Sequence, residues 1–361
     1  MQSEGQGELE PAAAGSLERS GNTGVLMEPG AVNPALPGSV LVLGGGYSGQ
    51  RVAQALRNQG CAVTLTRRGD GRNGDLTDGD GFRWLRFDPD AGVVPTAADL
   101  AGVEAVLVTI PPDALGRDPV LQHLGSTLKT LAPRWVGYLS TTGVYGDSAG
   151  AWVNEESPTR PGLPRSRARL ACEQAWRQLN LPLQIFRLPA IYGPGRSPLE
   201  QLRNGTARLI HKPGQVFSRV HVDDIAGALL HCLGLPPERR PDTLILADTC
   251  PCPSSEMLGY AAHLLDCKLP PFQPYGRIEA ELSPMARSFW SENRRASSRR
   301  LRHQLGYRLL FASYREGLSA LTALERCPSG QAPAQPGRAR SKRETGDPSA
   351  LPPGGCGSPI R

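Results

Sequence analysis

The stretch SVLVLGGGYSGQRVAQAL, residues 39–56, decides the fold. Its first five residues form an apolar run that predicts a buried strand, and the apolar spacing after the glycines predicts an amphipathic helix. A second apolar run at 62–66 predicts another strand. A strand, a turn, a helix and a second strand in this order begin an α/β fold with a parallel sheet. The turn carries three glycines in the pattern G-x-G-x-x-G, namely Gly44, Gly46 and Gly49.

Each glycine of this turn has a mechanical role. Gly44 makes the tight turn off the strand, Gly46 lets the backbone approach a pyrophosphate, and Gly49 lets the helix pack close to the sheet. The unpaired N–H groups at the helix N-terminus then face the phosphates. A merely structural glycine-rich turn is the alternative, but the flanking strands and helix favour a dinucleotide site. We expect three further residues to contact that dinucleotide: Tyr47, Ser48 and Ile110.

The end of the second predicted strand indicates which dinucleotide is bound. An NAD-binding unit usually carries Asp or Glu there, about 20 residues past the glycines, to bond the ribose 2′-hydroxyl. This chain has Arg67 and Arg68 instead, and a guanidinium pairs well with the oxygens of a 2′-phosphate. The sequence therefore favours NADP over NAD, although a solvated surface turn has a similar composition. Asp88, at the end of the predicted strand 82–88, is expected either to face the adenine or to cap the strand.

Downstream, apolar runs alternate with helical patterns, which predicts a doubly wound, Rossmann-type parallel sheet with helices on both faces. Further strands are predicted at 105–110, 135–140, 183–187 and 243–247, and helices at 119–131, 167–179 and 223–233. The segment from about 254 to 326 has a mostly helical pattern with proline breaks, so we expect a small C-terminal cap on the sheet. The folded core would then span 38–326, between a disordered extension at 1–37 and a disordered basic tail at 327–361.

Composition argues against several function classes. The formal charge of +6 is modest and lies partly in the tail, so nucleic-acid binding is not expected. No apolar run of about 18 residues predicts a transmembrane helix. Glutamates near the N-terminus argue against a transit peptide, and eight scattered cysteines fit a reducing compartment, so we expect a cytoplasmic protein. No Cys and His spacing predicts a metal site, and Met27 is a candidate native start.

Four further segments resemble the extended short-chain dehydrogenase/reductases, the group of nucleoside-diphosphate-sugar epimerases and dehydratases. They are LSTTGVYG at 139–146, NEESPTRP at 154–161, RLPAIYGPG at 187–195 and RVHVDDIA at 219–226. Each alone is a weak match, but their order after a glycine turn is specific. The segment SENRRASSRRL at 291–301 is similar to the C-terminal signature of an atypical branch of this family. The resemblance implies a Rossmann core, an NAD(P) cofactor and hydride transfer with a small-molecule substrate.

The catalytic positions depart from the pattern of that family. Its members use a Ser or Thr with a Tyr-x-x-x-Lys pair on one helix face, in which the Tyr is the acid/base and the Lys lowers its pKa. Thr141 matches the Ser/Thr position, but Arg165 stands at the Tyr position and Arg169 at the Lys position. Arg169 could keep the ribose-binding half of the Lys role, whereas Arg165 does not deprotonate near neutral pH. Tyr145 is a candidate replacement acid, although the family uses it mainly as a structural residue.

On the substrate side, the same resemblance implies three residues: Arg187, Tyr192 and His221. Two arginines on one helix face at the cleft favour an anionic substrate such as a phosphate or carboxylate, with a solvated basic helix as the alternative. His221, Asp223 and Asp224 could form a relay or a metal site, but an Asp at a helix start is more often an N-cap. We therefore expect structural aspartates, His221 lining the cleft, and no bound metal.

Two main function classes follow from the sequence. The first is a soluble NADP-dependent oxidoreductase or epimerase-like enzyme in which Thr141 orients the reacting oxygen. The second is a non-catalytic NADP-binding sensor or scaffold, which the replacement of the Tyr/Lys pair by Arg165 and Arg169 suggests. An RNA-binding derivative rests only on net charge and the basic tail and is the weakest reading. We further expect no membrane partner and consider a homodimer.

Overall fold

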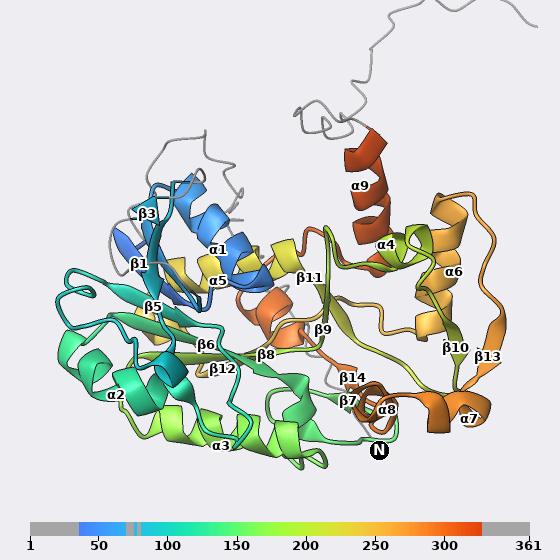
Figure 1. Cartoon of the computed structure of the whole chain (residues 1–361), viewed down its shortest axis with the longest axis horizontal. Coiled ribbons are helices and arrows are strands. Elements are labelled where there is room, and N and C mark those ends of the chain that lie inside the picture. Colours follow the sequence, from blue (N-terminus) through green and yellow to red (C-terminus); the bar gives the residue numbers. More distant parts are fainter. Residues whose placement is uncertain (1–35, 70–75, 78–80, 327–361) are drawn as a thin grey trace, which may run out of the picture.

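The computed structural model describes residues 36–69, 76–77 and 81–326, and a central eight-stranded sheet organises them (Figure 1). Seven neighbouring strands run parallel, and β3 adds a short antiparallel edge. This arrangement confirms the predicted Rossmann-type sheet. In order across the sheet, the strands are β12 (Thr243–Ile245), β8 (Leu183–Leu188), β6 (Trp135–Thr141), β5 (Ala105–Val108), β1 (Ser39–Leu43), β2 (Ala62–Arg67), β4 (Arg83–Arg86) and β3 (Leu76–Thr77).

Helices cover both faces of the sheet because its central strands are apolar on both sides. Alternate residues of β1 enter two separate core clusters, one on each face. The helices on the first face are α1 (Tyr47–Asn58) and α5 (Val222–Gly234), and those on the second are α2 (Pro119–Leu131) and α3 (Pro164–Arg177) (Figure 1). The predicted helix 119–131 has the expected bounds, whereas α3 begins three residues before its predicted start, at a proline suited to the first helical turn.

A smaller unit, which we call the cap, lies beside the sheet and has its own apolar cluster. It contains the helices predicted after residue 254, but it also includes a segment at 198–211 that the sequence did not assign to it. Helix α4 of that segment packs with α6 and α9 in this cluster, and β10 pairs with β13. The elements of the cap are α4 (Pro198–Arg203), β10 (Leu209–His211), α6 (Ser254–Leu264), β13 (Phe272–Pro274), α7 (Tyr275–Ile278), α8 (Pro284–Trp290) and α9 (Tyr314–Arg326).

Two short parallel strand pairs join the cap to the sheet. In the first, β9 (Ala190–Tyr192), which follows β8, pairs with β11 (Arg219–His221), which precedes α5. In the second, β7 (Trp152–Val153) pairs with β14 (Arg295–Ala296) and brings the C-terminal part of the chain back to the region after β6. These four strands were not predicted, because each is only two or three residues long and none lies in a longer apolar run. The remaining helical turns are η1 (Pro89–Ala91), η2 (Thr142–Tyr145), η3 (Pro237–Arg239), η4 (Glu279–Glu281) and the π-helix η5 (Arg300–Gln304).

Several predictions about the chain ends lie outside the described residues. These are the tail at 327–361, the candidate start Met27, and the extension at 1–37 apart from its last two positions. Leu36, the first described residue, packs its side chain into the core cluster on the α1 face. Within the ranges that the structure describes, no helix has the length and apolarity needed to cross a bilayer.

Candidate cofactor and substrate cleft

Three adjoining cavities follow the carboxyl ends of the parallel strands, where ligands bind in open α/β sheets. The first cavity, of about 460 Å³, lies between the glycine turn and the ends of β2 and β5. The second, of about 320 Å³, shares Gly46 and Thr109 with the first and extends to the end of β6. The third, of about 280 Å³, shares Thr141 with the second and reaches α8 of the cap. Together they form one cleft that crosses from the sheet to the cap.

The glycine turn is held by close packing and hydrogen bonds. Gly44 has φ +110°, and a Cβ placed on it would lie 2.3 Å from the Thr109 hydroxyl oxygen. That hydroxyl donates to the Gly44 carbonyl at 2.8 Å, and the Gly44 N–H donates to the Thr66 hydroxyl at 2.9 Å. A Cβ on Gly49 would lie 2.0 Å from the Gly44 carbonyl oxygen. Steric contact therefore excludes side chains at Gly44 and Gly49, as their predicted roles require.

Gly46 differs from the other two glycines because a Cβ there would meet no atom within 4 Å. It lines the first two cavities and is the N-cap residue of α1, so the open space beside it belongs to the cleft. No side chain among the described residues caps α1 at this end. The N–H groups of the first helical turn are thus available to an anion, and Tyr47 and Ser48 line the second cavity beside them.

The residues predicted to choose the dinucleotide lie at the far end of the first cavity. Arg67, Arg68 and Ile110 all line it. The Arg67 guanidinium lies 5.1 Å from the centroid of the Trp84 ring. Asp88 is not among the lining residues, and its carboxylate accepts a hydrogen bond from Arg86 at 2.9 Å. That bond lowers the pKa of Asp88 and leaves its predicted contact with adenine without geometric support.

The structure brings Thr141, Arg165 and Arg169 together around the second and third cavities. Thr141 ends β6, and its hydroxyl accepts a hydrogen bond from the Gly143 N–H at 3.0 Å. Arg169 donates to the Leu139 carbonyl at 3.0 Å, which holds its guanidinium beside the second cavity. Thr141 thus shares one cavity with Arg169 and the next with Arg165.

Arg165 lies where the cleft meets the cap. Its guanidinium donates to the Ser288 hydroxyl and lies 4.6 Å from the centroid of the Phe289 ring. Both partners belong to α8, so this arginine connects α3 to the cap across the third cavity. Burial lowers the pKa of Arg165, but a guanidinium remains charged near neutral pH. The position that carries a Tyr in the family is therefore a fixed cation here.

Two predicted site residues pair with each other in the interior. The Tyr145 side chain is buried, and its hydroxyl accepts a hydrogen bond from Arg187 at 2.9 Å. Arg187 also donates to both carboxylate oxygens of Glu173, at 3.1 and 2.7 Å. Burial raises the pKa of Tyr145. Neither Tyr145 nor Arg187 lines the cleft, so the geometry favours structural roles over the predicted acid and substrate contacts.

Tyr192 and His221 are paired at the ends of β9 and β11, the strands that join the cap to the sheet. Tyr192 lines a fourth cavity, of about 490 Å³, which adjoins the cleft at Ile191. His221 is only 1% exposed and packs against the rings of Tyr192 and Phe311. Burial lowers the pKa of His221 to about 4, so the imidazole is neutral. His221 lines none of the four cavities described here, in contrast to its predicted place in the cleft.

The N-cap of α5 differs from the prediction. His221 is the cap residue, and its Nδ1 accepts a hydrogen bond from the Asp223 N–H at 3.2 Å. Asp223 instead forms an ion pair with Arg51 of α1. Asp224 accepts hydrogen bonds from the backbone N–H groups of Leu310 and Phe311 at 2.6 and 3.0 Å. Both aspartates are structural as expected, but they connect α5 to other segments rather than capping it.

Sequence reasoning missed Arg196, which lines the second, third and fourth cavities. Its guanidinium lies 5.6 Å from the centroid of the Tyr47 ring, beside the start of α1. Arg196 comes directly after the segment 187–195. Its place next to that glycine-proline turn is the sequence feature that could have indicated it.

Glu292 and Arg294, within the C-terminal signature, were also missed and line the third cavity. They form an ion pair at 2.7 Å, in which the Glu292 side chain is 7% exposed. The other carboxylate oxygen, Oε1, is buried without a partner among the described residues. The Gln215 side chain donates to the Glu292 carbonyl at 2.9 Å and holds this segment in place. The third cavity thus contains three arginines and one carboxylate, a set suited to an anion.

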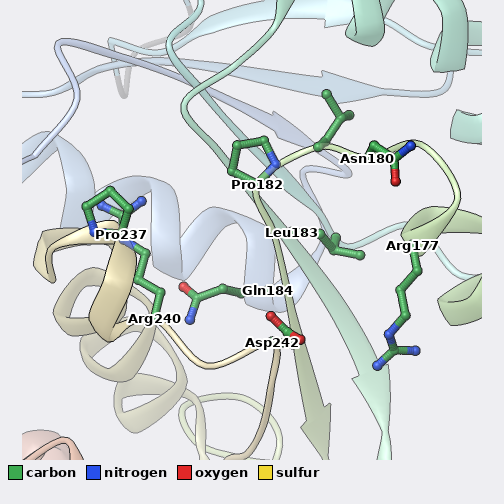
Figure 2. Close-up of a pocket in the computed structure, with 9 residues that line it drawn as sticks. Arg177, Asn180, Pro182, Leu183, Gln184, Pro237, Arg240 and Asp242 are labelled. Atoms are coloured by element: carbon green, nitrogen blue, oxygen red, sulfur yellow. The ribbon is translucent and has the colours of Figure 1, made fainter.

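A separate cavity of about 430 Å³ lies at the amino ends of β8 and β12 (Figure 2). Its polar side chains serve the fold: Arg240 donates to the Leu233 and Leu235 carbonyls, at the C-terminus of α5. Gln184 accepts from the Trp135 indole at 2.7 Å and donates to the Pro241 carbonyl at 3.0 Å. With these groups engaged, and the glycine turn at the opposite edge of the sheet, we do not assign a cofactor to this cavity.

Comparisons with known proteins bear on the whole domain. A sequence model of the NAD dependent epimerase/dehydratase family matches residues 40–244. A search of curated proteins found no match. Among solved structures, a functionally unknown conserved protein from Silicibacter pomeroyi DSS is 42% identical, with a TM-score of 0.71. That likeness covers 79% of this chain and 98% of the other.

Two more distant structures share the fold. A human epimerase family protein, solved with NADPH, is 20% identical with a TM-score of 0.59, and the likeness covers 79% of this chain and 99% of that protein. A UDP-glucuronic acid 4-epimerase from Bacillus cereus, solved with NAD, is 18% identical with a TM-score of 0.62, and the coverage is 82% and 99%. At these identities the likeness concerns the architecture alone.

Proposed function

Because this chain belongs to the NAD dependent epimerase/dehydratase family, we propose that it binds NADP in the cleft and transfers hydride with a small anionic substrate. The observation that carries this proposal is the continuity of the cleft. It runs from Arg67 past Gly46 to Thr141 and then to Arg165. A dinucleotide in the first two cavities would place its reactive ring between the glycine turn and the cationic third cavity.

The cofactor assignment rests on the fit of the glycine turn and on charge. The open space beside Gly46 and the uncapped start of α1 suit a pyrophosphate. Arg67 and Arg68 would pair with the 2′-phosphate that distinguishes NADP from NAD. The NADPH in the human epimerase family protein and the NAD in the Bacillus cereus enzyme are consistent with either dinucleotide, so the preference for NADP depends on these arginines.

In the proposed reaction the bound nicotinamide supplies or accepts the hydride. Thr141 accepts from the Gly143 N–H and can donate its own proton to a substrate oxygen, which would orient that oxygen. Arg169 would bond the nicotinamide ribose, and Arg165 would attract the anionic group of the substrate. Arg165 would also stabilise negative charge on the reacting oxygen. Because its guanidinium would not exchange a proton near neutral pH, the proton that accompanies the hydride would pass between the substrate oxygen and solvent water.

A second candidate is a non-catalytic NADP-binding sensor or scaffold. Two observations favour it: Arg165 is bound to Ser288 at the position of the family's Tyr, and Tyr145 is buried against Arg187. Both proposals require cofactor binding, and they differ only in turnover. We also propose a reducing, cytoplasmic location, since the six cysteines in the described part of the chain are all free thiols.

Two measurements test these proposals in turn. Nicotinamide fluorescence is followed while the full chain is titrated with NADPH and, separately, with NADH. We expect tighter binding of NADPH. Binding of neither would contradict a dinucleotide site, and equal binding would contradict the specificity.

A panel of carbonyl compounds, hydroxy acids, sugar phosphates and nucleotide sugars is then tested for a change in nicotinamide absorbance. Turnover that Thr141→Ala abolishes supports the enzyme. NADPH binding without any turnover across the panel would favour the sensor.

A further inference from the structure

Arg67 has a specific support in the structure, the indole ring of Trp84. The two residues lie on neighbouring parallel strands, where Leu65 is opposite Trp84 and Arg67 is two positions farther along β2. The Arg67 guanidinium lies 5.1 Å from the ring centroid, within the range of a cation–π interaction. Arg67 itself is exposed, whereas the Trp84 side chain is buried in the core cluster on the α1 face. A buried ring therefore holds an exposed cation beside the first cavity.

The same ring also packs under the glycine turn. A Cβ placed on Gly45 would lie 2.3 and 2.5 Å from two carbon atoms of the Trp84 six-membered ring. The Gly45 N–H donates to the Thr66 carbonyl at 2.7 Å, which fixes the turn to the end of β2. Trp84 therefore contacts both Arg67 and the phosphate-facing turn, and it sets the position of one relative to the other.

Among the residues that the structure describes, no aromatic ring supports Arg68 in this way. Its side chain is 66% exposed, and it is paired at 3.8 Å with Asp90, which is 85% exposed. An exposed pair of this kind contributes little and restricts the side chain little. Of the two arginines on the first cavity, Arg67 is the one whose guanidinium is preorganised.

We propose that Trp84 is a positioning residue for the choice between NADP and NAD: its ring holds Arg67 ready for the 2′-phosphate. This inference rests on the proposed NADP binding and adds the residue that determines how strong the preference is. Preorganisation reduces the side-chain entropy lost on binding, and the cation–π contact limits the orientations that Arg67 can adopt. Replacing the ring should weaken NADPH binding more than NADH binding.

The test compares the dissociation constants of NADPH and NADH for the full chain and its variants. It also compares the inhibition constant with which adenosine 2′-phosphate competes against NADPH binding. Trp84→Leu removes the π face, and we expect it to raise the NADPH dissociation constant about fivefold, with a smaller effect on NADH. Trp84→Phe keeps an aromatic face and should preserve most of the preference. Adenosine 2′-phosphate lacks the pyrophosphate and nicotinamide, so its inhibition constant isolates the 2′-phosphate contact.

Phe82→Leu is the matched control. Phe82 is buried in the same core cluster and carries the Arg57 guanidinium 5.2 Å from its ring centroid, but Arg57, unlike Arg67, does not line the first cavity. We expect this variant to leave the ratio of the NADPH and NADH constants unchanged. Arg67→Ala gives the full loss of preference against which the Trp84 variants are scaled.

Three outcomes would overturn the inference in distinguishable ways. If Arg67→Ala removes the preference but Trp84→Leu leaves the ratio unchanged, NADP binding stands and the role of Trp84 fails. If Trp84→Leu weakens NADPH and NADH equally, the ring supports only the fold. If the natural chain binds both dinucleotides equally well, the proposed cofactor specificity fails, and the inference fails with it.

Discussion

At the scale of single residues, the cleft brings together the positions that the family resemblance singled out, but with different side chains at two of them. Thr141 and Arg169 stand beside the second cavity, where the family's Ser/Thr and Lys are expected. Arg165 replaces the family's acid with a group that stays charged. Tyr145, the candidate replacement acid, hydrogen-bonds to Arg187 in the interior instead. The proposed enzyme would therefore depend on electrostatic stabilisation more than on proton transfer from a side chain.

The glycine turn yields a prediction that separates folding from binding. Gly46→Ala should fold normally, because Gly46 has φ −81° and a Cβ there meets open space. That Cβ would occupy the space needed by the pyrophosphate, so we expect the NADPH dissociation constant to rise about tenfold. Fluorescence titration and urea unfolding measure the two effects separately. Unchanged NADPH affinity would mean that the pyrophosphate does not approach Gly46.

Gly49→Ala is the contrasting variant in the same turn. Its Cβ would lie 2.0 Å from the Gly44 carbonyl oxygen, so α1 or the turn must shift. Forced repacking of this kind costs about 1–3 kcal/mol, and we expect the free energy of unfolding to fall by that amount. Urea unfolding monitored by tryptophan fluorescence measures the change. Full stability would argue against the close approach of helix and turn.

The Arg187–Glu173 ion pair is predicted to be a determinant of stability. The side chains are 6% and 0% exposed, so Arg187→Met would remove the bidentate cation from a buried carboxylate. Among the described residues, Glu173 would keep the Ser140 hydroxyl and the Arg177 guanidinium, which lies 3.7 Å away. We expect the free energy of unfolding to fall by about 3–5 kcal/mol, measured by urea unfolding. As the control, Arg68→Met removes an exposed pair and should cost less than about 1 kcal/mol. A stable Arg187→Met protein with impaired substrate binding would instead support the substrate role predicted from the sequence.

At the scale of elements, buried polar side chains at strand ends decide how helices and loops connect. Asp224, in the first turn of α5, accepts hydrogen bonds from the backbone at 310–311 and so connects the segment before α9 to α5. Asp248, just after β12, accepts from the Cys250 N–H at 3.2 Å, while its Oδ2 is buried without a partner among the described residues. Burial raises the pKa of Asp224 to about 6 and that of Asp248 to about 7.

The raised pKa of Asp248 predicts how stability depends on pH. The unfolded chain loses this proton near its ordinary value of 3.8 and the folded protein near 7, so the free energy of unfolding falls as pH rises between these values. Asp248→Asn removes that fall. We therefore expect the stability of the variant relative to the natural chain to increase with pH, by at most about 1.4 kcal/mol per pH unit.

Urea unfolding at about pH 5 and about pH 8 measures this difference, because the two conditions fall within and above the window. Asp90→Asn is the control, since the Asp90 side chain is 85% exposed and should show no such trend. A difference between Asp248→Asn and the natural chain that is independent of pH would mean that Asp248 stays ionised in the folded protein.

At the scale of the whole molecule, the segment around 291–296 connects the sheet to the cap. Backbone N–H groups at Ser148 and Gly150 both donate to the Asn293 carbonyl, and β14 pairs with β7 two residues later. The Asn293 side chain donates to the Gly214 carbonyl at 2.9 Å and accepts from the Val216 N–H at 3.1 Å. This segment thus holds the far wall of the third cavity.

Asn293→Ala tests that connection. It leaves two backbone groups near the third cavity without their partner, so we expect the free energy of unfolding to fall by about 1–3 kcal/mol. The glycine turn makes none of these contacts, so the NADPH dissociation constant should stay within about twofold of the natural value. Urea unfolding and fluorescence titration are the measurements. Loss of NADPH affinity in this variant would show that the cap and the cofactor site are coupled.

The sequence by itself determined the sheet, its main helices and the glycine turn. These follow from local signals: apolar runs of four to six residues, helical spacing, and three glycines at fixed intervals. The short strands β7, β9, β11 and β14 were not predicted, because they owe their existence to partners far away in the chain. The N-cap of α5 was assigned to the wrong residue for a related reason, since Asp223 and Asp224 bond to distant segments instead.

Only the tertiary structure decided which of the candidate residues meet in one cleft. Thr141 and Arg294 line the same cavity although 153 positions in the sequence separate them. No local sequence pattern indicates that two such residues meet. Arg187 and Tyr145 show the converse: their motif suggested the cleft, but a buried carboxylate on α3 holds them in the core. Helix and strand propensities depend on residues that are neighbours in the sequence. The burial and charge pairing of a side chain depend instead on residues from distant parts of the chain that the fold places next to it.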